Sequence, residues 1–209
     1  MGRAPAFCGV ILAAGESSRL GQPKALLPWR GGTFLSGAIR VLNMFTDMVI
    51  VVVGKNATQL HHVVDANAGF LVVNHHPDRG QFSSLQLGVQ EVLNRGRDAA
   101  IITLVDRPPA QAETVKHLKH EFLARVDQNI WAAMPEFEGK HGHPYVAGRE
   151  LIGAYLDAKP DANARDIQHA HADRIIYVPV NDPLVTVNID TPEDYTRFTE
   201  IYSEKTLAR

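Results

Sequence analysis

A chain of 209 residues, 45% of them hydrophobic, is long enough to bury one sizeable core, and we expect residues 1–209 to form a single domain. The formal net charge of −2 argues against a dedicated nucleic-acid binder, because such proteins usually carry a basic excess. No apolar run approaches the roughly 20 residues that span a bilayer, and the opening MGRAPAF lacks an apolar signal core, so we expect no membrane association. The single Cys8 cannot form an internal disulfide, which favours a reducing compartment and a cytoplasmic protein.

Apolar, β-branched runs alternate along the chain with stretches typical of helices. In chain order, we expect strands at 7–13, 48–54, 70–74, 99–105, 130–134 and 174–179. We expect helices at 34–45, 58–66, 83–94, 111–126, 149–156, 163–169 and 192–206. The last of these has Thr191 as its N-cap and Pro192 in its first turn.

This alternation predicts an α/β fold with right-handed crossovers. The run MVIVVVG at 48–54 is apolar on both faces, as in strands that helices cover on both sides. Ligands in such sheets bind beyond the carboxyl ends of the strands. We therefore expect the loops after Ala14, Asn74 and Val105 to share one edge of the sheet.

The stretch GVILAAGESSRLGQPKALLPW, residues 9–29, places a glycine-containing loop directly after the first strand. Strand, glycine loop and helix form the general plan of a phosphate site, because backbone N–H groups point at the anion. A Walker A loop is excluded because five residues separate Gly15 from Gly21, and no G-x-G-x-x-G fingerprint occurs. Arg19 and Lys24 could hold a triphosphate and stabilise a leaving pyrophosphate. The alternative is a surface loop whose basic residues are merely solvated.

The segment LAAGESSRLGQPK resembles the signature L-A-A-G-x-S-x-R-x-G-x-x-K of the GT-A-type nucleotidyltransferases. Within them, the chain is most similar to the molybdenum cofactor cytidylyltransferase group. Further similar segments follow in family order: GQFSSLQLGV at 80–89, LVDRPP at 104–109, GHPYV at 142–146, NARDI at 163–167 and VNIDTPEDY at 187–195. The resemblance implies a three-layer, Rossmann-like fold with a mostly parallel mixed sheet. It places the nucleotide on Leu12, Ala13, Ala14, Gly15, Lys24, Ser83 and Ser84.

Nucleotidyl transfer passes an α-phosphoryl group from a nucleoside triphosphate to an acceptor oxygen, and its transition state is strongly anionic. Catalysis is therefore mostly positioning plus Mg²⁺, Lys and Arg. Lys24, Arg19 and Asp106 are the candidate catalytic residues, and Asp106 and Asp190 are the candidate Mg²⁺ ligands, since each follows an apolar strand-like run. The alternative for Asp106 is a turn before two prolines, and that for Asp190 is capping of the last helix.

The remaining motifs leave two questions open. Ser83 and Ser84 either cap the helix that they precede or place their hydroxyls against the base or ribose. Arg107 stands where relatives often carry Gln, and it either adds charge near the phosphates or points to solvent. With His143 of the G-H-P segment, Arg107 is a candidate acceptor-binding residue.

The first functional hypothesis is an Mg²⁺-dependent enzyme that attaches CMP from CTP to a molybdopterin acceptor, with a molybdoenzyme as a further candidate partner. A second keeps the reaction and changes the acceptor to another phosphorylated compound. A third is a maturation chaperone that binds the cofactor without turnover. A nicotinamide oxidoreductase is a fourth, weakened by the missing dinucleotide fingerprint.

Overall fold

The computed structural model describes residues 4–15, 20–159 and 161–202. Within these ranges, eight strands form one mixed sheet in the order β10-β7-β9-β6-β1-β4-β5, with β8 paired to β7. All neighbouring pairs are parallel except those that involve β8 and β9. The strands are β1 (Phe7–Ala13), β4 (Met48–Val53), β5 (Gly69–Val73), β6 (Ala99–Leu104), β7 (Ala132–Phe137), β8 (Lys140–His141), β9 (Tyr145–Ala147) and β10 (Ile175–Pro179).

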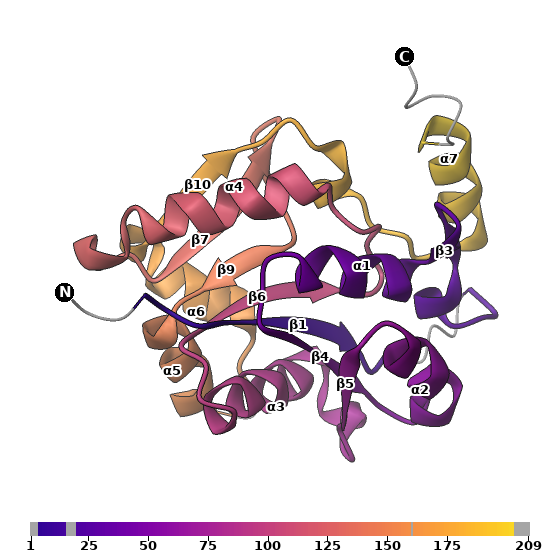
Figure 1. Cartoon of the computed structure of the whole chain (residues 1–209), viewed down its shortest axis with the longest axis horizontal. Coiled ribbons are helices and arrows are strands. Elements are labelled where there is room, and N and C mark those ends of the chain that lie inside the picture. Colours follow the sequence, from indigo (N-terminus) through magenta and orange to yellow (C-terminus); the bar gives the residue numbers. More distant parts are fainter. Residues whose placement is uncertain (1–3, 16–19, 160, 203–209) are drawn as a thin grey trace.

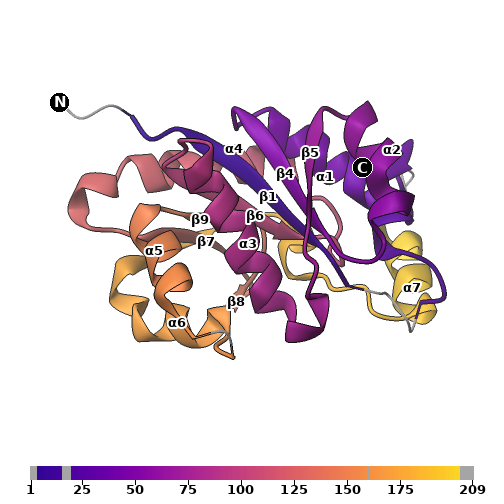
Figure 2. The same cartoon turned by 90° about the horizontal axis from the view of Figure 1, so that it is seen from below.

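Helices cover both faces of this sheet and produce three layers (Figure 1). One face carries α1 (Phe34–Asn43), α2 (Ala57–Ala66) and α4 (Ala112–Leu123). Figure 2 shows the other face, covered by α3 (Gln81–Asn94), α5 (Arg149–Asp157) and α6 (Ala164–Ala170). Short 3₁₀ turns lie between these elements: η1 (Lys24–Leu26), η2 (Pro77–Arg79), η3 (Val126–Gln128), η4 (Ala172–Arg174) and η5 (Pro183–Thr186).

The central strand β1 shows why the strands are apolar on both sides. Because side chains alternate along a strand, Ile11 and Ala13 pack under α1, α2 and α4, whereas Val10 and Leu12 pack under α3 and α5. Val10 is in register with Ile50 of β4 on one side and with Ile102 of β6 on the other. Because both faces of the central strands are buried, we expect the functional polar side chains at the ends of the strands and not in the middle of the sheet.

A third apolar cluster lies at the carboxyl edge of the sheet. Helix α7 (Pro192–Tyr202) packs there beside the hairpin of β2 (Pro28–Trp29) and β3 (Gly32–Thr33). The Trp29 ring lies 4.7 Å from that of Phe198 and 6.5 Å from that of Phe34, measured between centroids. Figure 1 shows the arrowheads of β1 and β6 pointing toward α7 and β3. The cluster therefore joins an early segment of the chain, which includes the β2–β3 hairpin, to a late one, helix α7, at this edge.

The α/β fold and all six expected strands are confirmed, with the strand expected at 130–134 displaced to β7. The two-stranded hairpin and strands β8 and β9 were not predicted, because runs of two or three residues carry no periodicity. Antiparallel β9 is the important omission, since it joins β6 to β7 and makes the sheet mixed. Helix α7 begins at Pro192 as expected, and residues 203–206 of the expected range lie outside the described residues. No helix in the described part of the chain is long and apolar enough to cross a membrane.

The packing of α3 on the sheet gives a test of the fold. A Cβ atom at Gly88 would lie 2.8 Å from Val10 Cγ1 and 3.1 Å from Val52 Cγ2, which is closer than packed carbons approach. Gly88→Ala should therefore lower the free energy of unfolding by about 1–3 kcal/mol, measured by urea denaturation. Gly153→Ala is the matched control in α5, where a new Cβ meets nothing within 4 Å. It should be neutral or stabilise by about 0.5–1 kcal/mol, and equal midpoints for the two variants would contradict this packing.

Candidate active site

The expected meeting of loops at the carboxyl edge of the sheet is confirmed. The backbone N–H of Val105 donates to the Leu12 carbonyl (3.1 Å), which holds the loop after β6 against the end of β1. The Asn56 side chain donates to the Ala13 carbonyl (2.8 Å) from the loop after β4. A cavity of about 120 Å³ lies where the loops after β1 and β5 meet, and it is lined by Leu12, Ala14, Gly15, Pro77, Gly80, Gln81 and Ser84.

Four of the expected nucleotide-binding residues, Leu12, Ala14, Gly15 and Ser84, therefore line one cavity. Ala13 does not, because strand alternation turns its methyl group into the core under α1 and α2. The carbonyl of Ala13 is bonded to Asn56. The side chain of Ala13 therefore faces the core, and its assignment to the nucleotide site stays a prediction.

Neither serine caps α3. Gly80 occupies the N-cap position with φ = 90°, a conformation that favours glycine, and the helix begins two residues earlier than expected. The Ser83 hydroxyl donates to the Gly80 carbonyl (2.8 Å), and Ser83 does not belong to the cavity lining, whereas the buried Ser84 does. Asn74 orders both, since its amide donates to Ser83 Oγ (3.0 Å) and Ser84 Oγ (2.9 Å). No motif in the sequence predicts that Asn74 orders these two serines.

Charged residues from the two ends of the chain meet beside these loops. Lys24 Nζ lies 2.6 Å from Asp190 Oδ1, and the two side chains are 12% and 32% exposed. The backbone N–H of Ile189 donates to the carbonyl of Asp106 (3.0 Å), which brings Asp190 next to Asp106. Asp194 and Thr191 cap the start of α7, because their side chains bond the backbone there. The capping alternative for Asp190 is therefore wrong, and its carboxylate faces Lys24.

Asp106 is the most unusual carboxylate of this group. Burial raises the pKa of Asp106 above its ordinary value; Lys24 and Arg107 oppose the rise and Asp190 adds to it. Its Oδ1 atom is enclosed and has no hydrogen-bond partner among the described residues. An enclosed carboxylate oxygen without a donor, next to a second carboxylate, fits the hard oxygen ligands that Mg²⁺ prefers. Asp106 and Asp190 are therefore suited to hold such an ion.

Arg107 does not point to solvent. Its Nη1 donates to the Val185 carbonyl (3.2 Å), and burial lowers the pKa of its guanidinium, opposed by the charges of Asp106 and Asp190. The backbone N–H of His143 donates to the same Val185 carbonyl (2.9 Å), so the two candidate acceptor-binding residues are neighbours. The His143 Nδ1 atom is enclosed without a partner among the described residues.

His143 lines a second and larger cavity of about 410 Å³. The walls of this cavity also include Asn163, Ala164 and Arg165, the segment expected to belong to the acceptor. Leu12, Gly80 and Gln81 line both cavities, which makes them neighbours. Of the expected site residues, Arg19 alone lies outside the described residues.

Asp182 also lies in this region, although it belongs to none of the motifs identified in the sequence. It is 1% exposed, and its carboxylate accepts from the backbone of Gln111 (2.8 Å) and Leu184 (3.1 Å) and from the Thr114 hydroxyl (2.8 Å). These bonds tie η5 to the start of α4. Because η5 supplies the Val185 carbonyl, Asp182 holds the backbone that positions Arg107 and His143.

An ammonium group, two carboxylates and a glycine loop at one sheet edge meet the needs of transfer from a polyphosphate. The chain is a nucleotidyltransferase with a Rossmann-like α/β fold. Residues 9–175 match the MobA-like NTP transferase domain, and the chain belongs to that family.

Three curated relatives match nearly the full chain. The molybdenum cofactor cytidylyltransferase of Escherichia coli (strain K12) is 29% identical over 198 residues, which are 93% of this chain and 96% of the relative. The nicotine blue oxidoreductase of Paenarthrobacter nicotinovorans is 28% identical, with 92% and 96% covered. The molybdenum cofactor guanylyltransferase of Xanthomonas euvesicatoria pv. vesicatoria (strain 85-10) is also 28% identical, with 91% and 93% covered.

A solved structure confirms the fold. The crystal structure of Rv0371c from Mycobacterium tuberculosis H37Rv superposes with a TM-score of 0.78 at 26% identity, covering 95% of this chain and 99% of that chain.

The enclosure of His143 predicts a pH dependence of stability. Burial, assisted by the charge of Arg107, lowers the pKa of His143 to about 3, against about 6.5 in an unfolded chain. The unfolded state therefore binds the proton first, and the stabilisation that is present above pH 6.5 is lost as the pH falls toward 3. His143→Gln should lose less stability than wild type between pH 6.5 and 4.5, measured by thermal melts. His75→Gln, at an exposed histidine, should keep the wild-type pH profile, and coincident profiles for all three proteins would contradict the burial of His143.

Proposed function

We propose that this nucleotidyltransferase is an Mg²⁺-dependent cytidylyltransferase that transfers CMP from CTP to the molybdopterin form of the molybdenum cofactor and releases pyrophosphate. The observation that carries the proposal is the sharing of one wall by two cavities of different size, at the same sheet edge where Lys24, Asp106 and Asp190 lie together. The smaller cavity is assigned to the nucleotide and the larger to the acceptor. The similarity to the E. coli cytidylyltransferase supports the choice of acceptor.

In the proposed reaction, an oxygen of the acceptor's terminal phosphate forms a bond to the α-phosphorus of CTP. The bond between the α-phosphorus and the bridging oxygen breaks, and pyrophosphate leaves. A phosphate monoester is largely ionised near neutral pH, so the attack requires no base. This agrees with a neutral His143, whose lowered pKa keeps it uncharged. Arg107 and His143 would orient the acceptor phosphate, which is a positioning role.

The cations of the site have separate tasks. Mg²⁺, held by Asp106 and Asp190, would stabilise negative charge on the phosphates. Lys24 would turn from Asp190 to the β- and γ-phosphates, and Arg19, close to it in the sequence, would assist it. A lysine side chain suits this movement because its compact ammonium group lies at the end of a flexible aliphatic chain.

Base selection is assigned to Ala14, Ser84 and the backbone of residues 80–84. The cavity of about 120 Å³ between Ala14 and Ser84 favours a pyrimidine over a purine. The Ser84 hydroxyl and nearby N–H groups can donate to the O2 and N3 acceptors of cytosine. Guanine presents N1–H and N2–H₂ donors instead, so donors would face donors. Ser83 is left out of this role because its hydroxyl is bonded to Gly80.

The test of the reaction is a pyrophosphate-release assay with CTP, GTP, ATP and UTP, each with and without molybdopterin. Buried polar groups left unpaired cost about 1–3 kcal/mol each, so we expect kcat/KM for CTP to exceed that for GTP by at least about tenfold. Release that depends on molybdopterin would support the acceptor. Equal rates for CTP and GTP would overturn the base assignment, and no release with any nucleotide would favour a chaperone or the redox chemistry named for one relative.

The Lys24 ammonium should act mainly in the transition state. Removal of one such charge typically costs about 3 kcal/mol, a factor of about 10² to 10³ in rate. Lys24→Ala should therefore lower kcat by that factor and change KM for CTP much less, measured by steady-state kinetics at saturating Mg²⁺. Lys116→Ala is the matched control, since its side chain is 66% exposed. A variant that changed only KM would show that Lys24 binds ground state and transition state equally.

A further inference from the structure

A hydrogen-bonded chain of three side chains from three different elements lies in and behind the wall of the larger cavity. Gln168 of α6 donates from Nε2 to the Tyr155 hydroxyl of α5 (2.7 Å). The Tyr155 hydroxyl lies 3.1 Å from the hydroxyl of Tyr145 on β9. Tyr145 and Gln168 line the cavity, whereas Tyr155 lies behind them and is 0% exposed. The proposed nucleotidyl transfer assigns no role to these groups.

The hydrogen bonds within this group limit which polar atoms remain available to a ligand. Burial raises the pKa of Tyr155 to about 12 and that of Tyr145 well above its ordinary value, so both hydroxyls keep their protons. Tyr155 accepts from Gln168, and either tyrosine hydroxyl can donate to the other; when Tyr155 donates, the Tyr145 proton is available to a bound ligand. Because the Gln168 nitrogen is bonded to Tyr155, its carbonyl oxygen remains to accept. In this arrangement the two lining residues offer a ligand one donor, the Tyr145 hydroxyl, and one acceptor, the Gln168 carbonyl.

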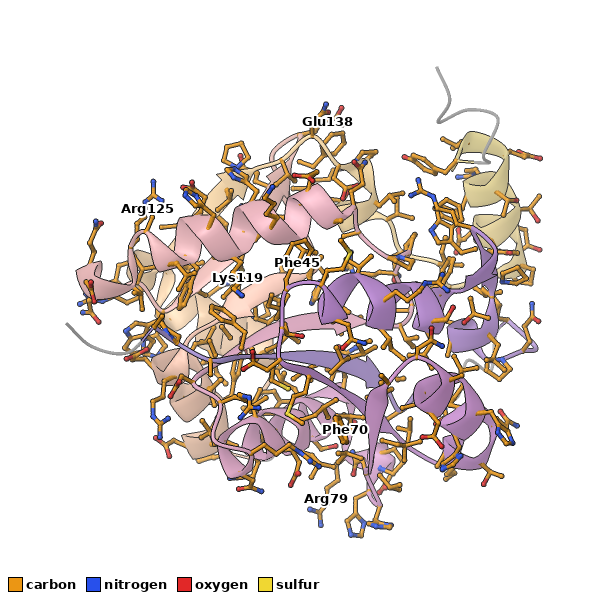
Figure 3. All side chains as sticks on the ribbon, viewed as in Figure 1. Phe45, Phe70, Arg79, Lys119, Arg125 and Glu138 are labelled. Atoms are coloured by element: carbon orange, nitrogen blue, oxygen red, sulfur yellow. The ribbon has the colours of Figure 1, made fainter. Side chains whose placement is uncertain are left out.

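The rest of the cavity wall restricts the shape of what could bind there. Leu12, Phe82 and Ile102 form an apolar surface, and the volume of about 410 Å³ is in the range of small-molecule sites. A flat ring can cover such a surface while its edge meets the polar pair. Arginines add positive charge at the rim: Arg165 belongs to the lining, and Figure 3 shows Arg79 projecting from the edge of the molecule.

We propose that this cavity recognises the acceptor by the lactam edge of a planar heterocycle, with Tyr145 donating to the ring carbonyl and the Gln168 carbonyl accepting from the adjacent ring N–H. The inference rests on the proposed function in taking this ring as part of the acceptor. His143 lines the same cavity and shares the Val185 carbonyl with Arg107. The phosphate end of the acceptor would therefore lie toward Arg107 and the ring toward Gln168. Tyr155 is a positioning residue that orients both contacts.

Two small rings whose edges have opposite hydrogen-bonding groups test the proposal on the whole chain. The probe is 2-amino-4-oxopteridine, which carries the lactam edge; 2,4-diaminopteridine presents an amino donor and a ring acceptor in its place. Wild type should bind the oxo ring at least about tenfold more tightly, measured by calorimetry at pH 7, because the reversed edge leaves the polar pair unmatched. Equal affinity for the two rings, or no binding of either, would overturn the proposal.

Variants assign the contacts. Tyr145→Phe and Gln168→Leu should each weaken binding of the oxo ring by about tenfold, and Tyr155→Phe should weaken it as well without touching the ring. Matched controls are Tyr177→Phe and Gln90→Leu, both at exposed positions, which should bind as wild type does. If Tyr145→Phe and Gln168→Leu both bound like wild type, the lactam contact would be wrong.

Turnover separates this inference from the proposed function. In the pyrophosphate-release assay, Tyr155→Phe should raise KM for molybdopterin while kcat and KM for CTP remain near wild type, which a general loss of folding would not produce. Unchanged KM for molybdopterin in an active Tyr155→Phe enzyme would overturn the inference alone. Selective ring binding by a protein that releases no pyrophosphate would support the ring site and overturn the proposed transfer reaction.

Discussion

Burial of the central strands on both faces is the constraint on which the rest of the molecule depends. Val10 and Ile11 are consecutive residues of β1, and both are completely enclosed, one under each helical layer. A charged group at such a position would cost several kcal/mol unless it was paired. Polar side chains are therefore displaced to the ends of the strands. The parallel direction of β1, β4 and β6 then collects Gly15, Asn56 and Asp106 at a single edge.

The ion pair between Lys24 and Asp190 closes this edge across 166 positions of sequence. Isolated surface pairs contribute little to stability, and this pair gains its fixed geometry from the apolar cluster around it. Leu20 and Leu27 flank Lys24 in the chain, and Ile189 precedes Asp190, and all three are buried in that cluster. The hydrophobic contact of α7 with the β2–β3 hairpin thus aligns the first loop with the last motif. The apolar packing therefore brings the two charges together.

The sequence allowed the long elements to be predicted because their signal is local. Strand β4 reads MVIVVV, and no tertiary information is needed to expect it. The position of the loops after β1, β5 and β6 at one edge of the sheet follows from the alternation of strands and helices alone. Strand β9 could not be predicted, since its three residues are too few for a periodic pattern and it is held by pairing with β6 and β7, which are distant in the sequence. The interpretation of Ser83 and Ser84 as caps failed because Gly80, with its left-handed conformation, starts α3 earlier.

Side-chain networks of the candidate site were beyond sequence reasoning for a different reason. Asn74 and Asp182 are ordinary polar residues in loops, and their importance arises from the groups that the fold brings to them. A buried carboxylate such as Asp182 must be satisfied by several donors, so the η5 turn cannot shift without breaking bonds to α4. That turn carries the Val185 carbonyl, to which both Arg107 and His143 are bonded. The same segment continues into Ile189 and Asp190, which contact Asp106 and Lys24. The acceptor side and the charged cluster therefore belong to one continuous piece of backbone, and any displacement at Asp182 would reach both.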